Sequence, residues 1–447
     1  MEKSKKIIIL SVFTALSILG VLLYFYFYQN YLKATGILHV VLFPRSATLN
    51  INDKLYTSKT GVFNLQLPAK TYQIVISYPG YSLVQKTGEI KPRQTLDLGT
   101  VYLFPKVWSK EELVSDTTID KFFPDQEFNR FVYFKKVAKN YDWYLYDRNT
   151  KDNIKFYQTT LLPQIFIFTP DRKQIIVELK DNDWQVVFLP KSLIEQPLNL
   201  NNELSSGLKQ NNLQTKQNPI IQEVAPLLDT NSEVLIKTNQ GLYQFNYLNK
   251  TVTQLVNTST SPFIIDADNI YYIKNNGLFV KLNLSQLKET QLSLVSFYDS
   301  KDNLDTLIIK KASQRDLFLI IKSTGQAFLV NALDGTSILL GDNIIDGSFS
   351  PSNDNILLYL NDKKITKVGV SQNIKKEPDL ISDSFPNYFL NDDFCLYSSS
   401  SSLNLYDFQN KEIISIGSDL KNSNFAYDPS LNYIFYLTPS GIKQISY

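Results

Sequence analysis

A short phrase that recurs along the chain limits the possible folds more than any other feature. An aromatic residue followed two places later by proline, with Asp or Ser beside it, stands at 122–125, 168–171, 349–352 and 427–430. Proline presets φ at a turn, and Asp or Ser can hydrogen-bond the turn backbone, so each phrase predicts a hairpin. The same order of polar turn and apolar run recurs without the proline. Eight such apolar runs begin near residues 131, 175, 234, 270, 317, 356, 394 and 434.

The spacing of these runs predicts the architecture. Most successive starts lie 36 to 47 residues apart, and one step is 59 residues. A four-stranded propeller blade takes about 40 to 45 residues. Each run is followed by a second strand-like run and usually by a third, and the 27 Tyr and 28 Phe of the chain favour strands. We therefore expect a mainly β protein with a β-propeller over residues 106–447, of eight blades, or seven if one weak unit belongs to its neighbour.

The last unit predicts how the ring closes. Residues 424–447 hold three strand-like runs, and the chain then stops before a fourth. At the other end, residues 106–116, "KVWSKEELVSD", precede the first blade and belong to no complete unit. We expect a strand from 106–116 to complete the last blade and remove its unpaired edge.

The N-terminus predicts a membrane anchor. Residues 7–28 hold no charge over 22 positions, and Lys3, Lys5 and Lys6 precede them. A helix of this length spans a bilayer core, and the positive flank places residues 1–6 in the cytoplasm and the rest outside. A cleaved signal peptide is the alternative, but its apolar region is shorter, about 7 to 15 residues.

Residues 36–105 form a separate unit of strand-like runs divided by turns, which predicts a small antiparallel β-sandwich. This segment resembles the PEGA domain family. The matching residues, in order, are Pro44-Arg45-Ser46-Ala47, Asn52-Asp53, Leu67-Pro68-Ala69-Lys70-Thr71-Tyr72 and Pro79-Gly80-Tyr81. The chain departs from the family pattern at Arg45, Ser46, Asp53 and Lys70. The resemblance implies an accessory module of a bacterial envelope protein without a catalytic role.

Residues 106–447 resemble TolB-type, WD-like β-propellers. The turn phrase carries this resemblance, together with the strands Tyr144-Leu145-Tyr146-Asp147 and Leu405-Tyr406-Asp407. The resemblance implies the fold only, because many unrelated functions share it.

The long step falls on residues 195–220, which are rich in Asn, Gln, Leu and Lys. We expect a fourth strand followed by an exposed insertion, with a lid or partner-binding loop as the alternative. Phe349 is expected to point into the packing between blades. Both His39, in the first strand of the sandwich, and the single cysteine, Cys395, are interpreted as structural strand residues.

The composition excludes several chemistries. The propeller holds no histidine to act as a general base, and the chain has no Gly-rich phosphate loop and no His/Cys metal cluster. With 45 basic and 43 acidic residues, no overall field attracts nucleic acid. We therefore predict no catalytic, cofactor-binding or metal residues, and no cofactor. The acidic groups that could serve a hydrolase instead are Asp266 with Asp268, Asp181 with Asp183, and Asp299, Asp302 and Asp305. All three groups lie at turn positions where Asp is favoured for backbone reasons, so they are interpreted as turn residues.

The sequence thus predicts a membrane-anchored, extracytoplasmic binding or scaffold protein of the bacterial cell envelope, not an enzyme. Its propeller would bind a protein segment or a glycan, so the expected partners are the membrane and an envelope protein or polysaccharide. The alternatives are an extracytoplasmic carboxylate-dependent hydrolase, and a sensor that signals through a partner.

Overall fold

The chain forms two compact units, residues 1–109 with Tyr447, and Lys110–Ser446, which are described separately. The structure is a computed structural model. It describes residues 14, 16–28, 34–180, 182–190, 196–213, 219–227, 230, 232–293, 295–298, 303–313, 315–352, 354–370, 380–381, 388–399, 401–408, 411–428 and 433–446.

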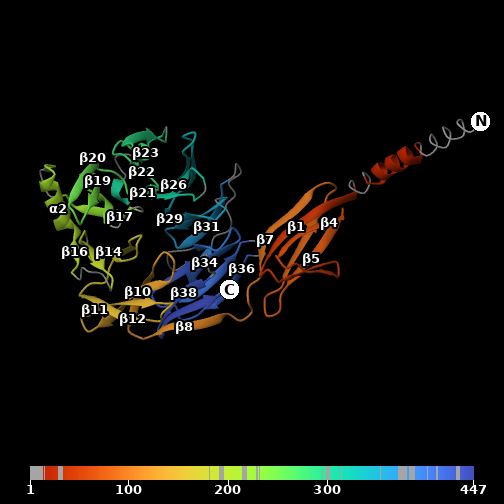
Figure 1. Cartoon of the computed structure of the whole chain (residues 1–447), viewed down its shortest axis with the longest axis horizontal. Coiled ribbons are helices and arrows are strands. Elements are labelled where there is room, and N and C mark those ends of the chain that lie inside the picture. The colour runs from red at the N-terminus through yellow and green to blue at the C-terminus, as the bar shows by residue number, and fades with distance from the viewer. Residues whose placement is uncertain are drawn as a thin grey trace, which may run out of the picture. The chain divides into compact units, whose positions relative to one another are not determined.

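The first unit begins with a helix over residues 16–28 (Figure 1). The predicted span of 7–28 lies only partly within the described residues, because 7–13 and 15 are outside them. Within the described part of the chain, no helix has both the length and the apolar character needed to cross a membrane.

The rest of this unit is a sandwich of two sheets, with strand orders β4-β1-β7 and β3-β2-β5-β6. Its strands are β1 (Thr35–Phe43), β2 (Thr48–Ile51), β3 (Lys54–Tyr56), β4 (Val62–Pro68), β5 (Thr71–Ser77), β6 (Val84–Glu89) and β7 (Thr95–Tyr102). Alternate residues such as Leu38, Val40 and Ile74 are fully buried between the sheets. The expectation of a purely antiparallel sandwich is wrong in one respect, because β1 and β7 pair in parallel.

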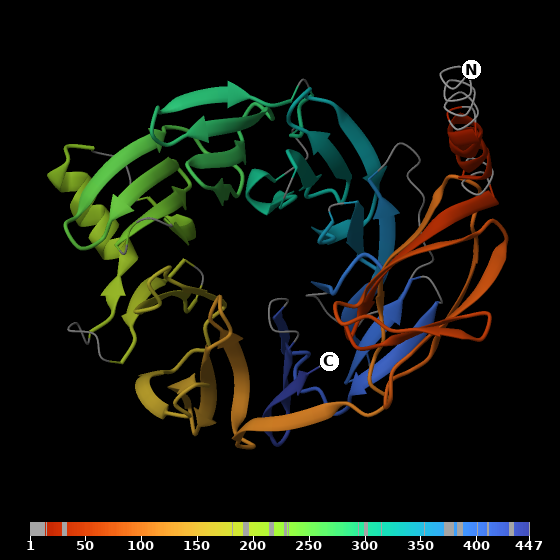
Figure 2. The ribbon, with the colours of Figure 1, turned by 45° about the vertical axis from the view of Figure 1, so that its right-hand side comes forward.

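The second unit is a ring of eight four-stranded sheets among its described residues, numbered here as blades 1 to 8 (Figure 2). Blades 1 to 4 are β9 (Ile119–Pro124), β10 (Arg130–Val137), β11 (Asn140–Asp147) and β12 (Asn153–Thr159); β13 (Ile165–Phe168), β14 (Gln174–Glu178), β15 (Trp184–Phe188) and β16 (Leu198–Asn199); β17 (Ile221–Pro226), β18 (Glu233–Thr238), β19 (Gly241–Asn246) and β20 (Thr251–Val256); and β21 (Ile264–Asp266), β22 (Asn269–Ile273), β23 (Phe279–Asn283) and β24 (Lys288–Gln291). Blades 5 to 7 are β25 (Ile308–Lys311), β26 (Leu317–Ile321), β27 (Ala327–Asn331) and β28 (Ser337–Gly341); β29 (Ile344–Phe349), β30 (Asn355–Leu360), β31 (Lys364–Gly369) and β32 (Leu380–Ile381); and β33 (Tyr388–Phe389), β34 (Phe394–Ser399), β35 (Ser402–Asp407) and β36 (Glu412–Gly417). Blade 8 is β37 (Phe425–Asp428), β38 (Tyr433–Thr438), β39 (Gly441–Ser446) and β8 (Ser109–Ser115).

The eight apolar runs singled out in the sequence are the second strands of the eight blades. Each of these strands, from β10 to β38, begins within one residue of the predicted start. The β-propeller prediction is therefore confirmed, with eight blades. Blades 1 to 7 are meanders in which consecutive strands are neighbours, and in blade 8 the fourth strand is β8, so in all eight blades the first of the consecutive strands lies at one edge of the sheet.

The ring closes as the sequence predicted, because β8 pairs with β39 and supplies the fourth strand of blade 8. The Asp116 N–H donates to the Ser440 carbonyl at 2.9 Å, and Val114 of β8 is buried in one cluster with Leu437 and Ile442. A second contact joins blades 8 and 1, where the Asn424 side-chain oxygen accepts the Phe122 N–H at 3.0 Å. Strands from opposite ends of the propeller sequence thus hold each other.

The repeated turn phrase works through a buried side-chain oxygen. Thr169 and Ser350 are each only 2% exposed, and their hydroxyl oxygens accept the N–H groups of Gln174 and Asn355 across the hairpin. In blade 1 the Asp125 carboxylate accepts the Arg130 N–H in the same way. The bonding residue precedes the proline in 168–171 and 349–352 and follows it in 122–125. The Asp or Ser after the proline also bonds the turn backbone as predicted, because the Asp171 carboxylate accepts the Lys173 N–H and the Ser352 hydroxyl oxygen accepts the Asp354 N–H, both at 3.1 Å.

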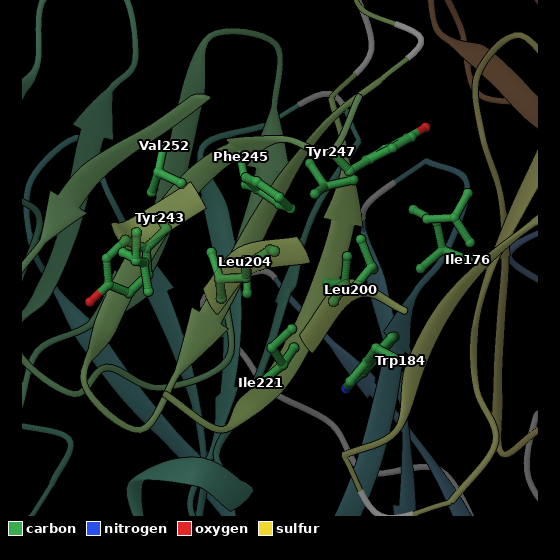
Figure 3. Packing of buried hydrophobic residues seen from close by; sticks show 14 of the residues in the cluster. Ile176, Trp184, Leu200, Leu204, Ile221, Tyr243, Phe245, Tyr247 and Val252 are labelled. Atoms are coloured by element: carbon green, nitrogen blue, oxygen red, sulfur yellow. The ribbon is translucent and has the colours of Figure 1, made fainter. Parts of the chain in front are cut away.

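For 195–220, the predicted fourth strand is confirmed as β16, but the prediction of an exposed insertion is wrong for the part that the structure describes. Residues 200–210 form helix α2 (Leu200–Gln210), and the side chain of its N-cap residue Asn199 accepts the Asn202 N–H. Leu200, Leu204 and Leu208 repeat every four residues and point into a core that includes Trp184, Ile221, Tyr243 and Phe245 (Figure 3). Burial of each leucine contributes about 1.5–3 kcal/mol, which explains why this stretch is ordered despite its polar composition. Residues 191–195 and 214–218 lie outside the described residues.

Candidate functional site

A cavity of about 590 Å³ lies among the first strands of four consecutive blades, 4 to 7. Its lining is formed by Ile264–Asp266 of β21, 309–313 at the end of β25, 348–351 at the end of β29, and Tyr388–Phe389 of β33. These strands are the innermost ones of the ring, which Figure 2 shows encircling a common centre. The cavity therefore belongs to the central channel of the propeller.

Two ion pairs hold β25 between its neighbours in this cavity. The Lys311 Nζ lies 3.0 Å from the Asp266 carboxylate of blade 4, and the Lys310 Nζ lies 3.6 Å from the Asp346 carboxylate of blade 6. Consecutive strand residues point to opposite faces of a sheet, so one lysine reaches each neighbouring blade. The pairs fix the position of β25 and leave little net charge in the cavity.

The remaining walls are mostly apolar and aromatic. Phe349 packs against the core between blades 5 and 6, as expected from the sequence, and it stays partly exposed to the cavity. Tyr388 packs edge-on against Phe425 at 5.7 Å, and burial raises its pKa to about 12, so it remains neutral. The Ser348 hydroxyl oxygen is buried and has no hydrogen-bond partner among the residues that the structure describes. Such a wall can contact apolar or stacking groups and still offer a few polar atoms.

The pairing register leaves main-chain groups of β25 free. The Ala312 N–H donates to the Leu317 carbonyl, which makes Ala312, Lys310 and Ile308 the residues bonded to β26. In an antiparallel ladder the alternate residues, here Ile309 and Lys311, direct their N–H and C=O groups away from the partner strand. Because β25 is the first strand of its sheet, these groups face the centre of the ring.

A polar cluster lies near the N-terminal ends of the inner strands. Lys237 is 1% exposed, and its ammonium group contacts the Asp305 carboxylate at 2.8 Å and the Gln222 side-chain oxygen at 3.1 Å. Beside it, the Glu223 carboxylate accepts the Phe263 N–H at 3.2 Å. Burial raises the pKa of Glu223 to about 7, although Lys237 and this hydrogen bond act in the opposite direction. The cluster joins blade 3 to blade 4 and to the segment before blade 5.

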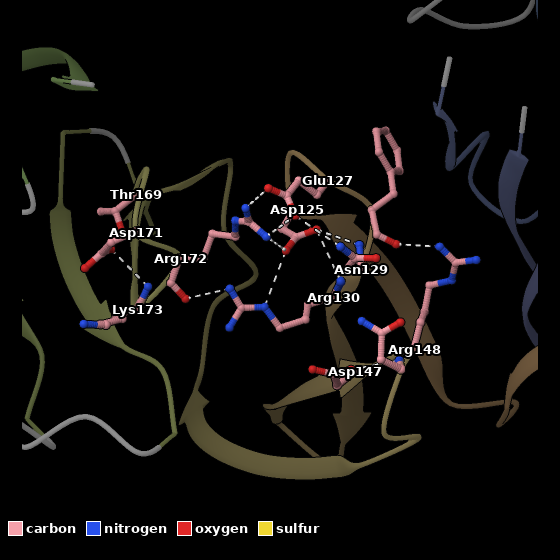
Figure 4. Close-up of polar contacts among 12 residues, drawn as sticks. Asp125, Glu127, Asn129, Arg130, Asp147, Arg148, Thr169, Asp171, Arg172 and Lys173 are labelled. Carbon is pink, nitrogen blue, oxygen red and sulfur yellow. Dashed lines mark hydrogen bonds and ion pairs between the residues drawn. The ribbon is translucent and has the colours of Figure 1, made fainter. Parts of the chain in front are cut away.

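A second polar cluster joins blades 1 and 2 (Figure 4), and Arg148 of this cluster also reaches blade 8. Arg130 pairs with Asp125 and donates to the Arg172 carbonyl at 2.9 Å, and Arg172 pairs with Glu127. Arg148 donates to the Gln444 side chain of blade 8 at 2.8 Å. Each charged group has a partner within the cluster, so its role is to join blades.

The acidic residues named from the sequence do not converge on one cleft. Asp266 is the only carboxylate among the described residues that line the cavity, whereas Asp268 lies on an exposed turn. Asp183 accepts hydrogen bonds from Asn199 and Gln185, and Asp305 pairs with Lys237. Asp181, Asp299 and Asp302 lie outside the described residues. Within the described part, no group of three or more His, Cys, Asp and Glu side chains could hold a metal ion.

His39 and Cys395, which the sequence analysis interpreted as structural strand residues, both lie within β-strands. His39 lies in β1, and its Nδ1 is 2.7 Å from the Asn64 side-chain oxygen on the neighbouring strand β4. Cys395 is fully buried in β34, and burial raises the pKa of its thiol.

Sequence reasoning missed Lys310 and Lys311. The signal was present, because two consecutive lysines follow two isoleucines in the first strand of blade 5.

The fold and the cavity together define a β-propeller with a ligand-sized central site. No family model matches the chain, and no curated protein matches it in sequence. Among solved structures, the C-terminal WD40 domain of Sif2 is similar at 11% identity, with a TM-score of 0.48, covering 76% of this chain and 98% of that chain. The Dos1 propeller is similar at 10% identity, with a TM-score of 0.48, covering 76% of this chain and 94% of that chain. BamB from Moraxella catarrhalis is similar at 8% identity, with a TM-score of 0.47, covering 76% of this chain and 96% of that chain.

Proposed function

We propose that this protein is a non-enzymatic, membrane-anchored binding protein of the bacterial cell envelope. Its propeller holds a segment of a partner macromolecule, a protein or a glycan, in the cavity among β21, β25, β29 and β33. The cavity carries this proposal, because its volume of about 590 Å³ lies within the range of roughly 300–1,000 Å³ typical of ligand sites.

The contents of the cavity favour binding over hydrolysis. Glycoside hydrolysis needs two carboxyl groups about 5 to 9.5 Å apart. The described lining offers Asp266 alone, and its carboxylate is paired with Lys311. The aromatic side chains of Phe349, Tyr388 and Phe389 provide contact area instead.

The anchor and the envelope location rest on the N-terminal part of the chain. Residues 7–28 are uncharged and follow three lysines. In the helix over 16–28, the large apolar side chains are 47–66% exposed among the described residues, so this helix has an apolar surface all round. The PEGA-like sandwich would then separate the membrane from the propeller.

A binding screen tests the site. The full chain in detergent micelles is presented to a random peptide library and to an array of envelope oligosaccharides, and bound ligands are measured again on Phe349→Ala. We expect at least a tenfold loss of affinity in this variant. Leu333→Ala is the control, because Leu333 is 80% exposed on the turn between β27 and β28. Equal affinities of both variants and the parent would place the ligand elsewhere.

Fractionation tests the anchor. We expect the full-length chain to pellet with membranes and to resist carbonate extraction, and protease added outside should remove the propeller. A soluble chain that begins near residue 30 would contradict the anchor.

A further inference from the structure

We propose that the sandwich binds the phosphate of an anionic phospholipid headgroup, in a hollow at the end where β1 begins. This inference rests on the proposed membrane anchor, and it adds a second binding site to the cavity of the propeller. It follows from the residues that line the hollow, from the distribution of charge along the chain, and from the short connection between β1 and the helix.

The hollow has a volume of about 420 Å³ and lies on the sheet of β4, β1 and β7. It is lined by residues 35–37 of β1, Gln66 of β4, and 93–95 at the start of β7. The Gln66 side chain donates to the Thr35 hydroxyl oxygen at 3.0 Å, and Arg93 is exposed. Guanidinium groups bind phosphate oxygens in pairs, and hydroxyl and amide groups can donate to the remaining oxygens. The lining therefore suits a phosphate group.

The main chain holds Arg93 at this hollow. Its N–H donates to the Thr35 carbonyl at 2.8 Å, and its φ is +58°, a left-handed value that residues other than glycine seldom adopt. Gly36 allows the close approach, because a Cβ there would lie 2.3 Å from the Lys91 carbonyl oxygen and 2.7 Å from the Gln94 carbonyl oxygen. Residues in such conformations cluster at ligand sites, which supports a binding role for this arginine.

Two more basic side chains lie at the same end of the sandwich. Lys70 is in the turn between β4 and β5, and its carbonyl accepts the Ile90 N–H at 3.0 Å, which joins this turn to the loop that holds Lys91. Both lysines are exposed. The strand ends and turns here, residues 34–36, 67–71 and 89–95, hold three basic residues and one acidic residue, Glu89. This end of the sandwich is therefore positively charged.

The charge of the chain is divided between its parts. The sandwich, residues 34–105, has seven basic and three acidic residues, whereas residues 106–447 have 34 basic and 39 acidic ones. Lys33 adds one more positive charge directly before the sandwich. Anionic headgroups attract basic segments that lie next to a membrane helix. The part of the chain that follows the helix thus has the charge that complements such a surface.

The connection to the helix identifies the membrane as the source of the phosphate. The helix is described to Tyr28 and β1 begins at Thr35. Seven residues of extended chain span at most about 25 Å, so the end of the sandwich that holds Arg93 stays within this distance of the end of the helix. From Thr35 to Phe43, β1 itself runs about 26 Å toward the opposite end. The short connection therefore keeps the hollow close to the headgroups.

Amide exchange of the full chain in lipid nanodiscs tests the site. One set of discs contains phosphatidylcholine alone, and the other contains about 30% phosphatidylglycerol. We expect the amides of residues 90–95 to exchange at least fivefold more slowly in the anionic discs, and Arg93→Gln should reduce this difference below twofold. Arg45→Gln is the matched control, because Arg45 is an exposed arginine in the turn after β1, at the opposite end of the sandwich. The control should keep the full difference.

Arg93→Lys separates paired donation from charge alone, because lysine keeps the charge without the fork of donors. We expect an intermediate difference for this variant. Unchanged exchange of β1 and β4 in phosphatidylcholine discs shows that each variant is folded. No difference between the two sets of discs, or equal losses for Arg93→Gln and Arg45→Gln, would overturn the site.

Soluble phosphates test the source of the ligand. Inorganic phosphate and a poly(glycerol phosphate) polymer are added to the phosphatidylcholine discs at the phosphate concentration of the anionic lipid. We expect neither to slow exchange of residues 90–95 more than twofold. Slowing equal to that in the anionic discs would mean that the hollow binds a soluble phosphate, and the phospholipid inference would be wrong.

The failures of the two proposals are distinguishable. A chain that stays soluble in the fractionation contradicts the anchor, and the headgroup site falls with it. A chain that inserts into the discs but shows no response to anionic lipid retains the anchor and refutes the headgroup site alone.

Discussion

Replacement of Gly441 by alanine should weaken the joint that closes the propeller. Gly441 begins β39, where φ is +140°, a value that side chains disfavour. A Cβ added there would lie 1.9 Å from the Val114 carbonyl oxygen and 3.0 Å from the Asp116 nitrogen. Both are main-chain atoms of β8 and the residue after it, so the overlap can be relieved only if the strand moves.

The expected loss has two parts. Alanine at a positive φ costs about 1–2 kcal/mol. Displacement of β8 weakens one or two main-chain hydrogen bonds, at about 1 kcal/mol each. The total is about 3 kcal/mol. Unfolding entropy is about 2.1 cal/mol/K per residue, so over the roughly 340 residues of this unit the melting temperature should fall by about 4 °C.

Gly241→Ala is the matched control. Gly241 begins β19 at φ +156°, and a Cβ there would lie 2.1 Å from the Val256 carbonyl oxygen of β20. The local strain is therefore similar, but a short turn keeps β20 beside β19, whereas β8 is joined to β39 only through the whole ring.

Hydrogen exchange and calorimetry measure the outcome. Both variants should melt lower than the parent, and only Gly441→Ala should accelerate amide exchange in residues 109–115. A melting temperature of Gly441→Ala within 1 °C of the parent, with unchanged exchange in β8, would refute the closure by this strand.

Three further predictions concern the ring, helix α2 and pH. A propeller fragment that starts at Thr117 should melt many degrees below one that starts at Lys106, as severely as a fragment without 424–447; equal melting temperatures would mean that the ring closes another way. Leu204→Ala should lower the free energy of unfolding, measured by chemical denaturation, by about 2–5 kcal/mol because Leu204 is 1% exposed in the core. A loss below 1 kcal/mol would contradict the packing of α2 against this core. The Glu223 pKa rises from about 4.5 in the unfolded chain to about 7 in the folded one, so the folded state binds the proton more tightly and stability falls as pH rises from 4.5 to 7. The free energy of unfolding should fall by about 2–3 kcal/mol between pH 4.5 and 7, after allowance for partial exposure of Glu223, and Glu223→Gln should remove this dependence. Urea titrations across this pH range that show the same dependence in the variant would contradict the prediction.

The sequence alone determined the repeat and hence the ring. The second strand of each blade is a continuous apolar run, such as Phe131–Phe134, which is buried on both faces between blades. Such runs can be recognised in the sequence alone. The missing fourth strand of the last unit was also visible, because a blade with an open edge needs a partner and residues 106–116 were left over. Both inferences depend on local pattern and on counting.

Helix α2 was not predicted, because the polar composition of its segment hid the regular spacing of its buried leucines. Asn, Gln and Lys dominate residues 195–220, and only three leucines at a spacing of four mark the buried face. Three apolar positions among so many polar ones are too few to predict a buried helix from the sequence. In the folded protein these leucines pack into the core that includes Trp184 and Tyr243, and this burial stabilises the helix.

The candidate site was decided by the tertiary structure. Residues 264–266, 309–313, 348–351 and 388–389 are distant in sequence, and only ring geometry brings these inner strands around one cavity. The direction of the main-chain groups of Ile309 and Lys311 away from β26 depends on the register of the two strands, which the hydrogen bond from Ala312 to Leu317 shows. A shift of one residue would turn these groups toward the partner strand, so no reading of residue types could have revealed them.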